Sequence, residues 1–140
     1  MKWALQIQYL KEKEYSVIAI DSRAHGRSSD DQLIPLSYAQ MARDVIALMD
    51  ELEIPRFSVV GWSDGAILGL EIAMNYESRL DRFFSTYQVS NLNGTGAGRS
   101  PVLALLGARV ENEYKALSPT PDQYNVFIRR KNKMQSTQPD

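Results

Sequence analysis

Apolar residues recur along the chain with two different spacings, which separate predicted helices from predicted strands. In residues 2–13 the apolar positions lie about one helical turn apart, so this segment is predicted to form an amphipathic helix. Elsewhere, short apolar stretches of strand length interrupt the polar sequence, the first of them a continuous run typical of a strand buried on both faces. These stretches predict three strands, at residues 17–20, 57–60 and 82–87.

Helical patterns separate the three predicted strands. Ser37 is followed by Gln40, a capping-box spacing, and apolar positions at helical intervals then continue to Leu52, before Pro55. Residues 66–74 are apolar almost all round, which predicts a helix buried in the middle of the fold. Strand, helix, strand, helix, strand in this order predicts a parallel α/β sheet with right-handed crossovers.

The pattern changes after residue 87 and shows no return to strand. Residues 91–98 are rich in glycine and asparagine and are predicted to form a flexible loop. A helix is expected from Pro101 to about Leu117. Thr120, followed by proline and by Gln123, is then read as a capping box that opens a last helix reaching about residue 134.

Composition limits the classes of function that the chain can serve. With 140 residues, 44% hydrophobic and 24% charged, it is the size and type of one globular domain. Its net charge of −1 gives no overall attraction to nucleic acid or anionic lipid. It contains no cysteine and a single histidine, so we expect no metal site and no cofactor. Without a signal peptide or an apolar run of about 18 residues, a cytoplasmic location and no membrane partner are expected.

The sequence Gly61-Trp62-Ser63-Asp64-Gly65 directly follows the predicted strand at residues 57–60. Gly-x-Ser-x-Gly between a strand and a helix predicts a nucleophile elbow, in which a tight turn lifts the serine hydroxyl clear of the sheet. Small residues on either side let the strand and the helix approach closely. Ser63 is therefore the candidate nucleophile, and the backbone N–H of Asp64 is a candidate oxyanion-hole donor.

Three blocks of this sequence together resemble the α/β-hydrolase superfamily, in particular its small serine esterase and peroxidase-like members. They are residues 17–28, the helix from Tyr38 to Leu52, and residues 57–65. The resemblance covers residues 3–87 well. It implies an α/β fold, a truncated hydrolase core of about three parallel strands flanked by helices, followed by a helical cap-like extension. It also implies hydrolysis of a small acyl or carboxylic ester substrate through Ser63.

The resemblance divides the chain into four segments. Residues 1–90 are expected to form a partial hydrolase core that contains the elbow, and residues 91–99 a flexible loop. Cap-like helices are expected over residues 100–134, and a tail over residues 135–140.

The rest of a catalytic triad is harder to locate. The family's chain order is Ser, then Asp or Glu, then His, whereas His25 precedes Ser63 and the resemblance places it in a structural turn. Asp81 precedes its strand and is expected at the opposite edge of the sheet, and Asn91 cannot carry the charge that stabilises an imidazolium. We therefore expect a fragment, weakly active or inactive alone, that lacks the upstream oxyanion loop and the downstream triad Asp and His.

A second hypothesis belongs to another class of function. The alternative is a non-catalytic binding or interaction module that retains the hydrolase fold, with self-association through an exposed sheet edge. Some charged residues are expected to have structural roles only. Asp21 and Arg23 are expected to pair or hold their turn, and the basic run at residues 129–133 is expected to form a solvated helix face. The glycine spacing at residues 94–98 does not fit a dinucleotide-binding loop.

Overall fold

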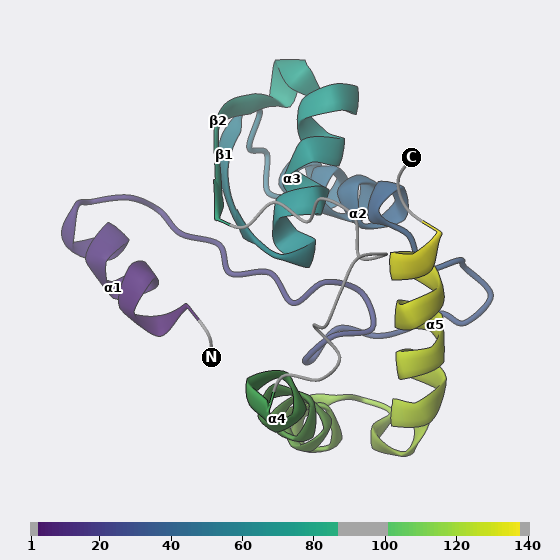
Figure 1. Cartoon of the computed structure of the whole chain (residues 1–140). Coiled ribbons are helices and arrows are strands. Elements are labelled where there is room, and N and C mark those ends of the chain that lie inside the picture. Colours follow the sequence, from purple (N-terminus) through teal and green to yellow (C-terminus); the bar gives the residue numbers. More distant parts are fainter. Residues whose placement is uncertain (1–2, 87–100, 138–140) are drawn as a thin grey trace.

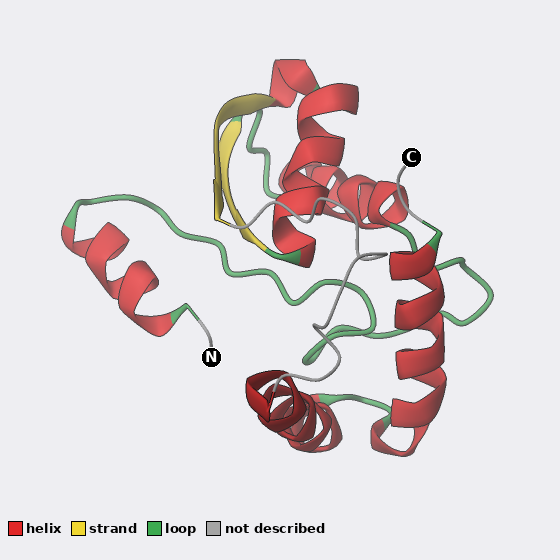
Figure 2. Cartoon of the chain, in the orientation of Figure 1, coloured by secondary structure: helices red, strands yellow, loops and turns green. Residues whose placement is uncertain are grey.

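Helices dominate the structure, and all of them except the first lie to one side of one small sheet (Figures 1 and 2). The computed structural model describes residues 3–86 and 101–137, and for residue 86 and residues 101–108 it describes the backbone alone. The loop predicted at residues 91–98 lies outside this range. The elements are α1 (Ala4–Glu12), α2 (Tyr38–Glu51), β1 (Phe57–Trp62), α3 (Asp64–Asn75), η1 (Glu77–Arg79), β2 (Leu80–Thr86), α4 (Pro101–Leu117), η3 (Pro121–Gln123) and α5 (Tyr124–Ser136).

The sheet in the described part of the chain has two parallel strands, joined by a helical crossover. β1 pairs with β2, with Val60 opposite Phe84 and Gly61 opposite Ser85, and α3 connects the end of β1 back to the start of β2. This unit confirms the predicted order of strand, helix and strand over residues 57–86. It places the Gly-x-Ser-x-Gly segment at the carboxyl end of β1, the edge of a parallel sheet where ligands bind.

The strand predicted at residues 17–20 is wrong. This segment has no regular secondary structure, and Ile18 and Ile20 are 44% and 40% exposed instead of buried on both faces. A strand needs a neighbour that supplies ladder hydrogen bonds. Within the described residues no strand lies beside this segment, so its apolar side chains stay open to solvent.

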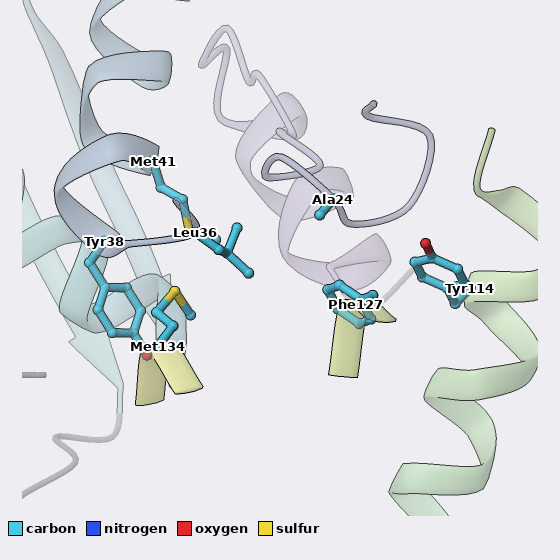
Figure 3. Close-up of a cluster of buried hydrophobic side chains, with 7 residues drawn as sticks. All are labelled: Ala24, Leu36, Tyr38, Met41, Tyr114, Phe127 and Met134. Carbon is cyan, nitrogen blue, oxygen red and sulfur yellow. The ribbon is translucent and has the colours of Figure 1, made fainter. Parts of the chain in front are cut away.

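Two apolar clusters hold the helices together. One lies between α2, α3 and the sheet and consists of Ala42, Val45, Met49 and Ile72. The other joins α4 and α5 to the turn after residue 20 and to the start of α2 (Figure 3), and consists of Ala24, Leu36, Tyr38, Met41, Tyr114, Phe127 and Met134. Leu68 of α3 packs against both clusters, so the elbow helix connects them.

The elbow helix is less buried than its composition predicted. Ala66, Gly69 and Ile72 of α3 are buried, but Leu70 is 42% and Met74 is 70% exposed. The reason is that α2, the sheet and the cluster that includes α5 cover part of α3, and Leu70 and Met74 lie outside the covered part. The apolar pattern correctly predicted a helix but overestimated how much of its circumference is covered.

Two of the predicted helix starts can be compared with the structure. Ser37 caps α2 as expected, because its Oγ accepts a hydrogen bond of 3.1 Å from the Gln40 backbone N–H. Thr120 makes no side-chain cap, and the segment after it is the short 3-10 helix η3. Its hydroxyl instead lies 3.4 Å from both Tyr114 Oη and Ser118 Oγ, which explains the failure of the capping-box prediction.

The helix α1 stands away from the rest of the molecule (Figure 1), and none of its residues is buried. The helix predicted at residues 2–13 is confirmed, but within the described residues its apolar side chains do not pack into a core. Of the helices that the structure describes, none has the length and apolar character needed to cross a membrane.

Candidate active site

Ser63 occupies a strained turn between β1 and α3. Its φ of 56° and ψ of −119° lie in a region that favours glycine. Its carbonyl oxygen accepts hydrogen bonds from the backbone N–H groups of Ala66 at 2.8 Å and Ile67 at 3.3 Å, which joins the turn to the first turn of α3. Such strain persists only where the surrounding structure fixes the backbone, and it is concentrated at functional sites.

The two glycines of the motif have different roles. A Cβ atom on Gly61 would lie only 2.2 Å from the carbonyl oxygen of Gly65, because the end of β1 passes directly against the start of α3. A Cβ atom on Gly65 would meet nothing within 4 Å. The close approach predicted from the motif is therefore present, but it requires a missing side chain only at Gly61.

The Ser63 side chain is half-buried, and within the described residues no side chain forms a hydrogen bond with its hydroxyl. His25 lies in the turn between Ser22 and Ser28, where its Nδ1 is 2.9 Å from the carbonyl oxygen of Arg23. Its ring packs edge-on against Phe127 of α5, with ring centroids 4.9 Å apart. The single histidine of the chain thus lies in a structural turn, where it contacts Arg23 and Phe127, as the resemblance implied.

The carboxylate of Asp64 is the centre of a polar network beside the turn. Tyr38 Oη donates to it at 2.8 Å, and Gln135 Nε2 lies 2.9 Å and 3.2 Å from its two oxygens. Lys131 Nζ lies 3.3 Å from Asp64 Oδ2. Burial alone raises the pKa of the Asp64 carboxyl, but the Lys131 charge and these hydrogen bonds outweigh it and lower the pKa below its usual value. Burial, followed by the neighbouring carboxylate, raises the pKa of Tyr38.

The turn that precedes α2 is held by its own charged residues, as predicted. Asp21 accepts a hydrogen bond of 3.2 Å from the Arg27 backbone N–H, and its carbonyl oxygen accepts one of 2.6 Å from the Ser28 hydroxyl. Arg23 donates two hydrogen bonds of 2.5 and 2.6 Å to Asp44 of α2. These pairs fix the turn against α2, and none of them reaches Ser63.

The basic run of α5 is only partly a solvated face. Arg130 is paired with Asp30 and donates to the carbonyl oxygen of Ile34 at 2.6 Å, and its side chain is only 18% exposed. Lys131 reaches Asp64, whereas Arg129 and Lys133 are exposed as expected. The prediction failed for the two inward residues because the sequence does not show which carboxylates α5 will meet.

Sequence reasoning also missed Tyr38, Lys131 and Gln135 as neighbours of the turn. One signal was available for α5: Lys131 and Gln135 are four residues apart and share a helix face with Phe127 and Met134, the two buried residues of that helix. Across the residues that the structure describes, no three histidine or acidic side chains come together in a metal-binding arrangement.

Comparison with known proteins places this geometry in a family. The family model described as the alpha/beta hydrolase fold matches residues 1–122. Among curated proteins, the chain is similar to a putative carbamate hydrolase, RutD, of a Caulobacter species and to 3-oxoadipate enol-lactonase 2 of Acinetobacter baylyi. Each is 39% identical over 80 residues, which are 57% of this chain and 30% and 29% of those proteins. The mouse serine hydrolase BPHL is 36% identical over 78 residues, covering 54% of this chain and 27% of that protein.

A solved structure gives the same result at the level of the fold. The structure of Est816, described as an enzyme that degrades N-acyl homoserine lactone, matches with a TM-score of 0.55 at 23% identity, covering 95% of this chain and 52% of that one. The chain therefore spans about a third of the length of the curated relatives above and about half of that solved structure. The match over residues 1–122 shows that the chain belongs to the alpha/beta hydrolase fold family.

Proposed function

We propose that this chain carries the nucleophile of a serine hydrolase that acts on small acyl or carboxylic ester substrates. The observation that carries the proposal is the strained conformation of Ser63 at the junction of β1 and α3, in a chain of the hydrolase family. Relatives named as a carbamate hydrolase and an enol-lactonase support the substrate class, because both names describe cleavage at a carbonyl carbon.

In the proposed reaction, Ser63 Oγ attacks the carbonyl carbon and loses its proton to a base. The developing oxyanion accepts a hydrogen bond from the Asp64 backbone N–H, and the base passes the proton to the leaving alcohol as its C–O bond breaks and the acyl-enzyme forms. Water then releases the acid. We propose that the base, its acidic partner and the second oxyanion donor come from outside these 140 residues, because His25 is engaged with Arg23 and Phe127.

A fluorophosphonate probe tests this proposal on the 140-residue chain itself. Without an adjacent base the reaction is slow, but one oxyanion donor remains, and losing such a donor costs about 10²–10³ in rate. We therefore expect Ser63 to be modified at least about tenfold faster than any other serine. Ser63→Ala should abolish this modification.

Ser58→Ala is the matched control, since Ser58 is an exposed serine on β1, the strand that leads into Ser63. It should leave the rate of modification at Ser63 unchanged. Equal modification of Ser58 and Ser63, or no modification of Ser63 above the level of the Ser63→Ala variant, would show that Ser63 is not an acyl acceptor in this chain.

One observation favours the second candidate, a binding or interaction module. Three large apolar residues on one face of the sheet are strongly exposed: Val60 at 49%, Trp62 at 45% and Phe84 at 61%. Exposed apolar side chains on a sheet, and strand edges that pair with no strand among the described residues, favour association with another chain. A defined oligomer in sedimentation together with no modification of Ser63 would select this function over the enzyme. The cytoplasmic location expected from the sequence stays a prediction.

A further inference from the structure

The side chain of Asp64 is held by residues of two helices, α2 and α5. Tyr38 of α2 donates to Oδ1, and Gln135 and Lys131 of α5 approach the same carboxylate from the C-terminal helix. Asp64 is also the first residue of α3 and directly follows Ser63. Asp64 therefore supplies both the carboxylate at the centre of the network and the backbone N–H that is the proposed oxyanion donor.

Other contacts besides this network attach α5 to the molecule. Phe127 and Met134 of α5 are each 2% exposed within the apolar cluster of Figure 3, and the Arg130–Asp30 pair holds the same helix to the turn before α2. The contacts to Asp64 add a second charge pair whose two side chains are 23% and 31% exposed. A partly desolvated ion pair is weak evidence for stability, since desolvation offsets much of its attraction.

The network adjoins the strained backbone at Ser63. Ser63 has a positive φ of 56°, and the peptide that carries the Asp64 N–H is oriented by ψ of Ser63, −119°, and by φ of Asp64. A carboxylate held by donors from two helices leaves Asp64 little freedom to rotate, and oxyanion donors act through such preorganisation. We propose that Lys131 and Gln135 are positioning residues, which act through the Asp64 carboxylate to orient the Asp64 backbone N–H. This inference rests on the proposed function of that N–H.

The test compares variants of α5 in the 140-residue chain. Lys131→Met and Gln135→Leu should slow modification of Ser63 by the fluorophosphonate about tenfold, less than the loss of a whole oxyanion donor. Lys133→Met removes the same charge from an exposed site on the same helix and should leave the rate unchanged. The double variant Asp30→Asn with Arg130→Gln removes a charge pair of α5 that does not contact Asp64, and it should keep the rate within about twofold.

Two further readouts separate positioning from a purely structural role. Asp64→Asn keeps an oxygen acceptor for Tyr38 and Gln135 and should retain more of the rate than Asp64→Ala. The backbone amide resonance of Asp64 should shift in Lys131→Met and Gln135→Leu and stay in place in Lys133→Met.

An unmoved Asp64 resonance in both variants would overturn the inference, as would an unchanged rate. A wild-type chain in which Ser63 does not react would instead overturn the proposed function. The amide resonance would then still show whether α5 positions the Asp64 peptide.

Discussion

Replacing the two glycines that flank Ser63 should have opposite effects on stability, although the motif treats them alike. In Gly61→Ala the new Cβ would lie 2.2 Å from the Gly65 carbonyl oxygen, 2.5 Å from the Gly65 carbonyl carbon and 2.8 Å from the Ala66 nitrogen. All three are backbone atoms, so no side chain can rotate away. The end of β1 must therefore separate from the start of α3.

The size of the effect follows from this geometry. Overpacking a well-packed core costs about 1–3 kcal/mol, and a clash against backbone belongs at or above the upper end of that range. Such a loss is a large part of the roughly 5–15 kcal/mol that stabilises a typical domain. Gly65→Ala adds a methyl group in open space inside a helix, where alanine is favoured over glycine by up to about 1 kcal/mol.

Urea unfolding followed by circular dichroism measures both variants. With a denaturant slope of about 1–3 kcal/mol per molar, a loss of about 3 kcal/mol lowers the midpoint for Gly61→Ala by at least about 1 M. Gly65→Ala should unfold at the wild-type midpoint or slightly above it. If Gly61→Ala were as stable as wild type, or Gly65→Ala the less stable of the two, the close approach at the elbow would be described incorrectly.

Two further predictions concern stability. Ser63→Gly should stabilise the chain by about 1 kcal/mol, because glycine relieves the strain of the positive φ, whereas Ser63→Ala keeps that strain and should change urea stability little. Burial raises the pKa of Asp44, but the hydrogen bonds from Arg23 and Gln40 outweigh burial and lower the pKa overall. The ionised Asp44 carboxylate therefore stabilises the fold above about pH 4, and this stabilisation is lost as the pH falls through the lowered pKa of the folded state. Asp44→Asn should therefore cost about 1–2 kcal/mol at pH 7 and much less at pH 2, and an equal cost at both pH values would contradict this assignment.

The local elements were largely predictable from the sequence, because their signals are local. The capping pair at Ser37 and Gln40, the apolar run of β1 and the glycine-flanked serine each depend on neighbouring residues, and each lies where the sequence indicated. The run at residues 17–20 has an equally strong local signal but forms no strand, since pairing depends on a neighbour that its own sequence does not encode.

The surroundings of Ser63 were less predictable for the same reason. Tyr38, Lys131 and Gln135 meet Asp64 from sequence distances of 26, 67 and 71 residues, and the packing of α2 and α5 at the start of α3 brings them together. The helical spacing of Lys131 and Gln135 indicates a shared face with the buried Phe127 and Met134, but it does not indicate which residue that face meets. The motif also does not distinguish its two glycines, although in the structure only Gly61 lies too close to other backbone atoms to carry a side chain.

The most direct test of the proposed nucleophile is a crystal structure of the chain after reaction with a fluorophosphonate. The account predicts a phosphonyl group on Ser63 Oγ, with its phosphoryl oxygen accepting a hydrogen bond of about 2.7–3.1 Å from the Asp64 backbone N–H. A phosphonyl group on another serine, or a phosphoryl oxygen on Ser63 that points away from that N–H, would contradict it.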